Sequence, residues 1–216
     1  MIRNLLISGG PYHPFNETSA SIAAHLNDLG IVSQLCGVAE GFDRLTQEDF
    51  DLVTINALGF SMTQADKYGP LRDRFAHVCS EQDKTALQSH VARNGGLLGL
   101  HTAAVCFDTW AEWGDLLGIS WVWGQSHHPQ PGYFDVIDET GRFQIWDELY
   151  SDMQVAPDAT VLATAQDPEG GKAQPVMTAK DRCIYLALGH DLTATENPGY
   201  VRLLKEAAAR ALGNKG

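Results

Sequence analysis

The chain has 216 residues, of which 44% are hydrophobic and 19% are charged, and its 15 basic and 27 acidic residues give a formal net charge of −12. This length predicts one α/β domain over residues 1–216, and the composition is too apolar for a disordered chain. The excess of acidic residues argues against binding to nucleic acid or to an anionic membrane surface, because both carry negative charge.

The amino terminus and the cysteines bear on where the protein works. The first ten residues hold one basic residue and a short apolar run, which is typical of an opening strand and not of a signal peptide. The four cysteines are widely spaced and form no Cys-x-x-Cys pair. This spacing is typical of reduced thiols, so we expect a cytoplasmic protein.

Several short runs are apolar on both sides and are predicted to be strands. They cover residues 4–8, 32–38, 51–56, 96–100, 133–137, 160–164 and 183–188. Strands that are apolar throughout favour a sheet covered on both faces, and therefore a largely parallel one.

Helical patterns separate these runs. The predicted helices cover residues 16–29, 80–93, 102–117 and 198–212. The second begins with Ser80 and carries Asp83 three residues later, which is a capping-box pattern. Because strands and helices alternate, we predict a three-layer α/β fold with a mostly parallel sheet and helices on both faces.

Two stretches do not fit the alternation. Residues 59–78 are irregular and are expected to leave the sheet near an active face. Residues 119–132 contain two tryptophans and two histidines. We expect this loop to fold over a site, because its aromatic rings are costly to leave in water.

Histidines follow three of the predicted strands, and a fourth lies in the Trp-rich loop: His13, His101, His190 and His128. The carboxyl ends of parallel strands share one edge of the sheet, so these imidazoles are expected to converge there. The alternative for each of them is an ordinary surface or core histidine.

The turn at His101 is predicted to be sharp. Gly99 lies two residues earlier, and a helix is expected to begin directly after the turn, which together are typical of a nucleophile elbow. Since the apex residue is histidine, the position suits acid/base chemistry or metal ligation and not a lasting acyl intermediate. The amino terminus of that helix would lower the pKa of the imidazole.

Short motifs occur in the order seen in a known family. Gly-Leu-His-Thr-Ala at residues 99–103 resembles the elbow of the ThuA-like (trehalose utilisation) family, and Leu-Gly-His-Asp at residues 188–191 resembles its closing motif. His-Pro-Phe at 13–15, His-Pro at 128–129 and Asp-Glu-Leu-Tyr at 147–150 also match the family's pattern.

This resemblance implies a class I glutamine amidotransferase-like fold, of the flavodoxin-like type. It implies that His101 stands where an amidotransferase has its nucleophilic cysteine, and that His190 lies near the position of the catalytic histidine. It further implies a role in carbohydrate metabolism, with a trehalose-like disaccharide or a keto-sugar as the small-molecule substrate.

The first hypothesis is therefore an enzyme that processes a sugar by proton transfer. His101 or His190 would move the proton, and Glu148 or Asp191 would set a tautomer, as isomerisation, elimination or hydrolysis requires. The residues predicted to bind the substrate are Tyr12, His13, Trp123, His128 and Asp191.

A variant of this hypothesis includes a divalent, zinc-like metal ion, since imidazoles suit such ions. Its candidate ligands are His13, His101, His128 and His190. No His-x-His or His-Glu-x-x-His spacing supports the variant, and no other cofactor is predicted.

Two further functions remain as alternatives. A true glutaminase would need a cysteine or serine at the elbow, and Cys106, five residues beyond it, is expected to be a buried thiol. A noncatalytic module could bind a small molecule or a partner on the same fold.

The sequence leaves the roles of some residues open. Asp147 and Glu148 are either catalytic carboxylates or caps of a helix. The residues that belong either to the core or to a homo-oligomer interface are Trp110, Trp113 and Trp146.

Overall fold

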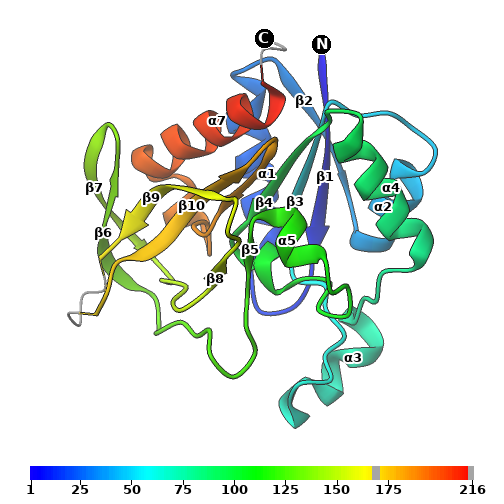
Figure 1. Cartoon of the computed structure of the whole chain (residues 1–216), viewed down its shortest axis with the longest axis horizontal. Helices are drawn as coiled ribbons and strands as arrows, with labels where there is room; N and C mark the ends of the chain where they lie inside the picture. Colours follow the sequence, from blue (N-terminus) through cyan, green and yellow to red (C-terminus); the bar gives the residue numbers. More distant parts are fainter. Residues whose placement is uncertain (167–170, 214–216) are drawn as a thin grey trace.

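The computed structural model describes residues 1–166 and 171–213, and its centre is one nine-stranded sheet of order β2-β1-β3-β4-β11-β10-β9-β6-β7 (Figure 1). The parallel part comprises β2 (Ile31–Cys36), β1 (Ile2–Gly9), β3 (Leu52–Ala57), β4 (Gly96–Leu100) and β11 (Cys183–Leu186). The antiparallel extension comprises β10 (Gln174–Lys180), β9 (Thr160–Ala165), β6 (Gly132–Asp138) and β7 (Gly141–Asp147). The predicted α/β fold with a mostly parallel sheet is confirmed.

Every strand predicted from the sequence is present, with its ends within two residues of the predicted ones. The sequence did not predict β7, β10 or the separate two-stranded sheet of β5 (Ile119–Ser120) and β8 (Gln154–Val155). In β7 exposed and less exposed residues are mixed, and β10 contains a proline near its start. Neither segment therefore resembles the uninterrupted apolar run of β4.

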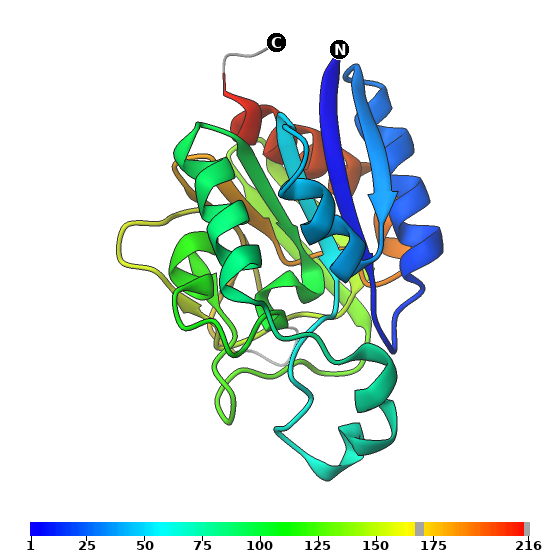
Figure 2. The same ribbon diagram turned by 90° about the vertical axis from the view of Figure 1, so that its right-hand side faces the viewer.

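Helices cover both faces of the parallel strands. On one face α1 (Phe15–Asn27) packs with α7 (Pro198–Leu212), and on the other α2 (Val38–Leu45) packs with α4 (Glu81–Ala92) (Figure 2). These helices cover the apolar strands from both sides, which is the three-layer arrangement that the sequence predicted.

The predicted capping box at the start of α4 is present. The backbone N–H of Asp83 donates to Ser80 Oγ at 3.2 Å, and the Ser80 N–H donates to the Asp83 carboxylate at 2.8 Å. Two of the amide groups that a helix start leaves without partners are satisfied in this way.

The prediction of one continuous helix over residues 102–117 is wrong. A short 3₁₀ helix, η2 (His101–Val105), is followed by an irregular turn and then by α5 (Trp113–Leu117). The backbone N–H of Phe107 donates to the Gly59 carbonyl at 2.8 Å, and Phe107 has a positive φ of 54°. The chain is therefore bonded to a neighbouring loop at the point where a helix would bond to its own preceding turn.

Residues 59–78, which the sequence predicted only as irregular, form a projection from the body. It contains η1 (Asp66–Tyr68) and α3 (Gly69–Phe75) and lies beyond the carboxyl ends of the parallel strands (Figures 1 and 2). Tyr68 packs edge-on against Phe60, with ring centroids 5.1 Å apart. The projection thus brings aromatic side chains to this end of the sheet.

Two of the three tryptophans whose place the sequence left open lie in the core. Trp110 and Trp113 are each 3% exposed. Trp146 on β7 is 36% exposed and packs edge-on against Tyr133, with ring centroids 5.0 Å apart. Of these three residues, Trp146 is thus the one available to an interface.

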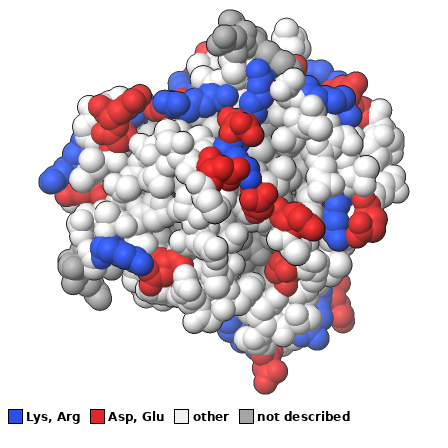
Figure 3. Space-filling model, in the orientation of Figure 1, with Lys and Arg blue, Asp and Glu red and all other residues white. Residues whose placement is uncertain are grey.

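Charged side chains of both signs are mixed on the surface. On the face seen in Figure 3, Lys and Arg lie scattered among Asp and Glu. Lys180, for example, contacts both Asp115 and Asp158. Basic residues therefore do not gather into one patch on this face. Among the described residues, no helix combines the length and the apolar character that a membrane crossing needs.

The approach of α7 to β4 requires glycine at position 96. A Cβ there would lie 2.7 Å from the Ala211 carbonyl oxygen, which belongs to the backbone and cannot turn away. We expect Gly96→Ala to lower the free energy of unfolding by about 1–3 kcal/mol in urea denaturation. Gly132→Ala is the control, because a Cβ there meets only the Gln130 carbonyl oxygen, at an ordinary 3.9 Å. Equal stability of the two variants would contradict the close packing of α7 on β4.

Candidate functional site

Three histidines and one glutamate meet at the carboxyl end of the parallel strands. His13 follows β1, His101 follows β4, His190 follows β11, and Glu148 follows β7. Glu148 Oε2 lies 3.8 Å from His13 Nε2, 3.5 Å from His101 Nε2 and 3.4 Å from His190 Nδ1. The four facing atoms all lie within 4.8 Å of one another. The structure thus brings together residues that are up to 177 positions apart in the sequence (13 to 190), and we call them the His/Glu cluster.

His101 occupies a strained turn between β4 and η2. Its φ of 42° lies in the left-handed region that residues other than glycine rarely adopt, and its side chain is 2% exposed. His101 Nδ1 bonds the Ala187 carbonyl at 2.7 Å, and Tyr185 Oη donates to the His101 carbonyl at 2.7 Å. The sharp elbow predicted from the sequence is present and is held by the β11 segment, but only the short η2 follows it.

Burial determines the charge of the elbow histidine. It lowers the pKa of His101 to about 4, so the ring is neutral near pH 7. The sequence predicted a lowered pKa for His101 from the amino terminus of a following helix. That predicted cause is wrong, because the largest cause is the burial of the ring. Since Nδ1 bonds a carbonyl, it carries the proton, and the lone pair lies on Nε2, which faces Glu148.

The carboxylate in the cluster is ionised. Burial alone would raise the pKa of Glu148, but the histidines that face it outweigh burial and hold this pKa far below its ordinary value. Glu148 in turn raises the pKa of His190.

The inward-facing atoms of the cluster lack partners. His13 Nε2, His101 Nε2, His190 Nδ1 and Glu148 Oε2 are buried and form no hydrogen bond with any described residue. Their N···O separations of 3.4–3.8 Å exceed those of charge-assisted hydrogen bonds, which are about 2.7–2.9 Å. Buried polar atoms are nearly always paired. Three imidazole nitrogens and a carboxylate oxygen around one point are a donor set that can hold a divalent metal ion.

Asp147 fixes the two segments that carry Glu148 and His190. Its buried carboxylate accepts hydrogen bonds from the backbone N–H groups of Gly189 at 2.7 Å, His190 at 3.1 Å and Glu148 at 2.8 Å. Burial raises the pKa of Asp147 to about 7 in spite of these donors. Residues 148–153, all of them described, contain no helix, so the alternative in which Asp147 and Glu148 cap a helix is wrong.

A cavity of about 260 Å³ opens beside the cluster and is lined by three of its members, His13, Glu148 and His190. Aromatic side chains make up most of the remaining lining: Tyr12, Phe60, Tyr68, Trp121, Trp123 and Tyr150. Residues of the 119–132 loop therefore line this cavity.

Of the other residues predicted to bind substrate, Tyr12, Trp123 and His128 line this cavity and Asp191 does not. His128 Nδ1 lies 3.4 Å from Glu148 Oε1. The carboxylate of Asp191 instead caps α6 (Leu192–Thr195) by accepting from the backbone N–H of Ala194 at 3.1 Å.

Sequence reasoning missed several lining residues. Tyr150 closes the Asp-Glu-Leu-Tyr motif, and its ring centroid lies 4.5 Å from that of His101, so the motif itself was a signal. Lys67 and Tyr68 lie in the irregular projection, where no periodicity pointed to a pocket.

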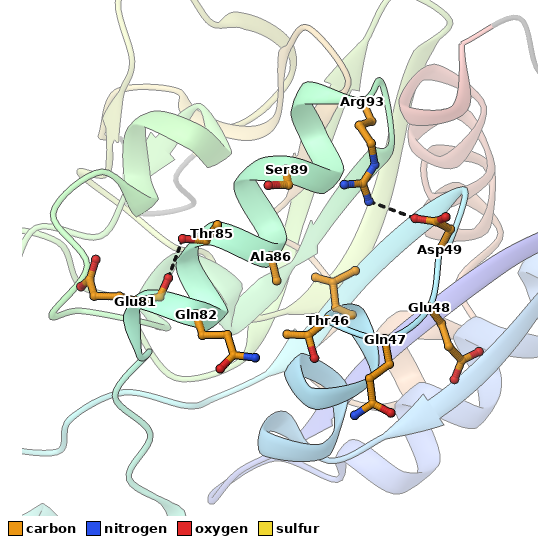
Figure 4. A pocket seen from close by; sticks show the side chains of 11 residues that line it. Thr46, Gln47, Glu48, Asp49, Glu81, Gln82, Thr85, Ala86, Ser89 and Arg93 are labelled. Atoms are coloured by element: carbon orange, nitrogen blue, oxygen red, sulfur yellow. Dashed lines mark hydrogen bonds and ion pairs between the residues drawn. The ribbon is translucent and has the colours of Figure 1, made fainter.

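A larger groove of about 590 Å³ runs along α4 (Figure 4). Arg93 forms an ion pair with Asp49 at 3.1 Å in this groove, and the Thr85 hydroxyl donates to the Glu81 carbonyl at 2.7 Å. None of the eight histidines lines it. The smaller cavity beside the His/Glu cluster is therefore the candidate site.

Cys106 is a buried thiol, as the sequence predicted. Its Sγ donates to the Ala57 carbonyl at 3.0 Å and accepts from the Gly59 N–H at 3.3 Å. Burial raises the pKa of Cys106 to about 12, so the thiol keeps its proton near pH 7. It does not line the candidate cavity.

The sheet order, with a sharp turn after β4, defines a class I glutamine amidotransferase-like fold. Within that class, the family model described as ThuA, trehalose utilisation, matches residues 40–209. The chain belongs to this family, and the resemblance of the short motifs is confirmed.

Solved structures agree with this assignment at the level of the fold. A protein described as ThuA-like from Parabacteroides merdae is 18% identical, with a TM-score of 0.75 over 99% of this chain and 91% of that one. A second, from Bacteroides uniformis, is 16% identical, with a TM-score of 0.67 over 99% and 92%. A protein described as a GMP synthase component from Thermoplasma acidophilum is 13% identical, with a TM-score of 0.55 over 97% and 94%. No curated protein sequence matches the chain.

All four cysteines are unpaired and buried, which predicts that the native protein is inert to thiol reagents. Burial also raises the pKa of Cys79 and Cys183 to about 12. We expect Ellman's reagent to modify no thiol rapidly at mildly alkaline pH, and to modify all of them in urea. Rapid modification of the native protein that is lost in Cys106→Ala would contradict the buried position of this residue.

Proposed function

We propose that the protein is a carbohydrate-processing enzyme that acts on a sugar, of the trehalose-like or keto-sugar type, in the cavity beside the His/Glu cluster. One observation carries the proposal: histidines and a carboxylate from separate motifs of a trehalose-utilisation family converge at the wall of an aromatic cavity. Perturbed titratable groups in a cavity are the usual mark of a reaction centre.

The aromatic lining supports a sugar as substrate. Sugar rings present C–H faces that pack on aromatic faces, while their hydroxyl groups need a few placed polar partners. Trp121 and Trp123 lie edge-on to each other in the lining, with ring centroids 6.3 Å apart. His13, His128 and Glu148 are the polar groups that hydroxyl groups of a bound ring would meet.

The cluster supports chemistry at a hydroxyl or carbonyl group. Isomerisation of a keto-sugar, elimination and hydrolysis each need a group that withdraws or supplies a proton or polarises an oxygen. The tautomer of His101 is set by the Ala187 carbonyl, and Glu148 is the carboxylate that faces the reactive nitrogens. Asp191, which caps α6, has no part in this proposal.

Two other functions fit the site less well. A glutaminase would need a thiolate or alkoxide at the elbow, and the elbow residue is His101. A noncatalytic binding module would have no need of an ionised, buried carboxylate among imidazoles, because such a group is costly to maintain.

Replacement of the elbow histidine tests the proposal. We expect His101→Asn to lower turnover of a sugar substrate by about 10²–10⁴-fold, since the imidazole is lost while asparagine tolerates a positive φ. The assay uses trehalose, simple glucosides and their keto derivatives, and circular dichroism checks the fold.

The matched control is His127→Asn, because His127 is exposed and lies outside the cavity. Unchanged turnover in His101→Asn would contradict the proposal. Binding of these sugars by the native protein without any turnover would favour the binding module.

A second prediction concerns the aromatic lining. Trp123→Ala should weaken sugar binding several-fold, since one aromatic contact contributes about 0.5–1.5 kcal/mol beyond its buried area. Trp123 is 39% exposed, and Trp146, 36% exposed on β7 and outside the cavity, offers a control of equal size and similar exposure. Titration by calorimetry should separate Trp123→Ala from Trp146→Ala, and equal affinities would place the sugar elsewhere.

A further inference from the structure

We propose that His13, His101, His190 and Glu148 together bind one divalent transition-metal ion, with zinc as the reference ion. This metal site lies at the centre of the proposed function. Only the substrate on which the ion would act rests on that proposed function. Binding of the ion itself can be measured without any substrate.

The spacing of the cluster fits an ion at its centre. Ligand atoms about 2.0–2.1 Å from a tetrahedral zinc ion are about 3.3–3.4 Å apart. Glu148 Oε2 lies 3.4, 3.5 and 3.8 Å from the nitrogens of His190, His101 and His13. These atoms are too far apart to bond one another and at nearly the separation that a shared ion imposes.

In two of the imidazoles, the ring nitrogen that points away from the cluster faces a backbone carbonyl, as in many metal sites. A metal-bound histidine commonly donates its other ring N–H to a backbone carbonyl or a carboxylate, which fixes the tautomer. His101 Nδ1 bonds the Ala187 carbonyl at 2.7 Å, and His13 Nδ1 faces the Pro11 carbonyl at 3.4 Å. Both rings therefore direct the lone pair of Nε2 toward the centre of the cluster.

The charge of the cluster also favours a cation. Glu148 Oε2 is buried without a hydrogen-bond partner, and a carboxylate oxygen in such a position is costly without compensation. A divalent ion supplies that compensation and satisfies all four unpaired atoms together. Since three of the ligands line the cavity, the ion would lie where a substrate oxygen can reach it and be polarised.

A second group of potential ligands serves as an internal control. His77, Cys79 and Asp83 also have ligand atoms within 4.8 Å of one another. The Asp83 carboxylate is already bonded in the capping box of α4, and burial raises the pKa of Cys79 to about 12. This group is therefore expected to remain unmetallated.

The experiment uses the full chain after removal of any polyhistidine tag. The protein is stripped with a chelator, exposed separately to Zn²⁺, Mn²⁺ and Co²⁺, desalted and analysed by elemental mass spectrometry. We expect one ion per chain for at least one of these metals, with a rise in melting temperature. The Co²⁺ form should show the visible bands of nitrogen and oxygen ligands and no sulfur charge-transfer band.

Matched variants locate the ion. His13→Gln and Glu148→Gln should each weaken metal binding by at least about tenfold. His127→Gln and His77→Gln should retain the ion, because His127 is exposed outside the cavity and His77 belongs to the control group. The Co²⁺ spectrum of the unaltered protein remains decisive if a variant does not fold.

The two proposals can fail separately. A native protein that takes up none of the three metals, or that keeps full metal content in both His13→Gln and Glu148→Gln, overturns the metal site. Full turnover of sugars by protein that has been shown to be metal-free overturns a part for the ion in the reaction and leaves the proposed function standing. A metal-loaded protein that turns over no sugar supports the metal site and contradicts the proposed function.

Discussion

The buried carboxylate of Glu148 is the group on which the organisation of the site depends. Its Oε2 faces His13, His101 and His190, and its Oε1 faces His128. An anion in this position is stable only if its surroundings supply positive charge or hydrogen-bond donors. The facing histidines hold the pKa of Glu148 far below its ordinary value, and Glu148 in turn raises the pKa of His190.

The two halves of the sheet each contribute to the cluster. The parallel strands deliver the three imidazoles to one edge, as their topology requires, while the antiparallel extension brings in Glu148 at the end of β7. Asp147 joins the halves, because one carboxylate accepts from the backbone on both sides of the junction. The strained backbone of His101 persists because Ala187 and Tyr185 hold it.

The sequence predicted all five parallel strands but only β6 and β9 of the four strands in the extension. Buried strands such as β4 are marked by uninterrupted apolar runs, whereas half-exposed β7 has none. The convergence of the histidines could be predicted from strand topology. The distances that suggest a metal ion depend on side-chain rotamers, which the spacing of residues along the sequence does not determine. The helix expected after His101 failed because Phe107 bonds the Gly59 carbonyl, a long-range contact with no local sequence signal.

X-ray absorption at the zinc edge of the zinc-loaded protein tests whether the His/Glu cluster holds the ion. We expect a first shell of nitrogen and oxygen only, at about 2.0–2.1 Å, with the outer-shell pattern of three imidazoles. A sulfur scatterer at about 2.3 Å, or a shell without imidazoles, would place the ion away from the His/Glu cluster and contradict this assignment.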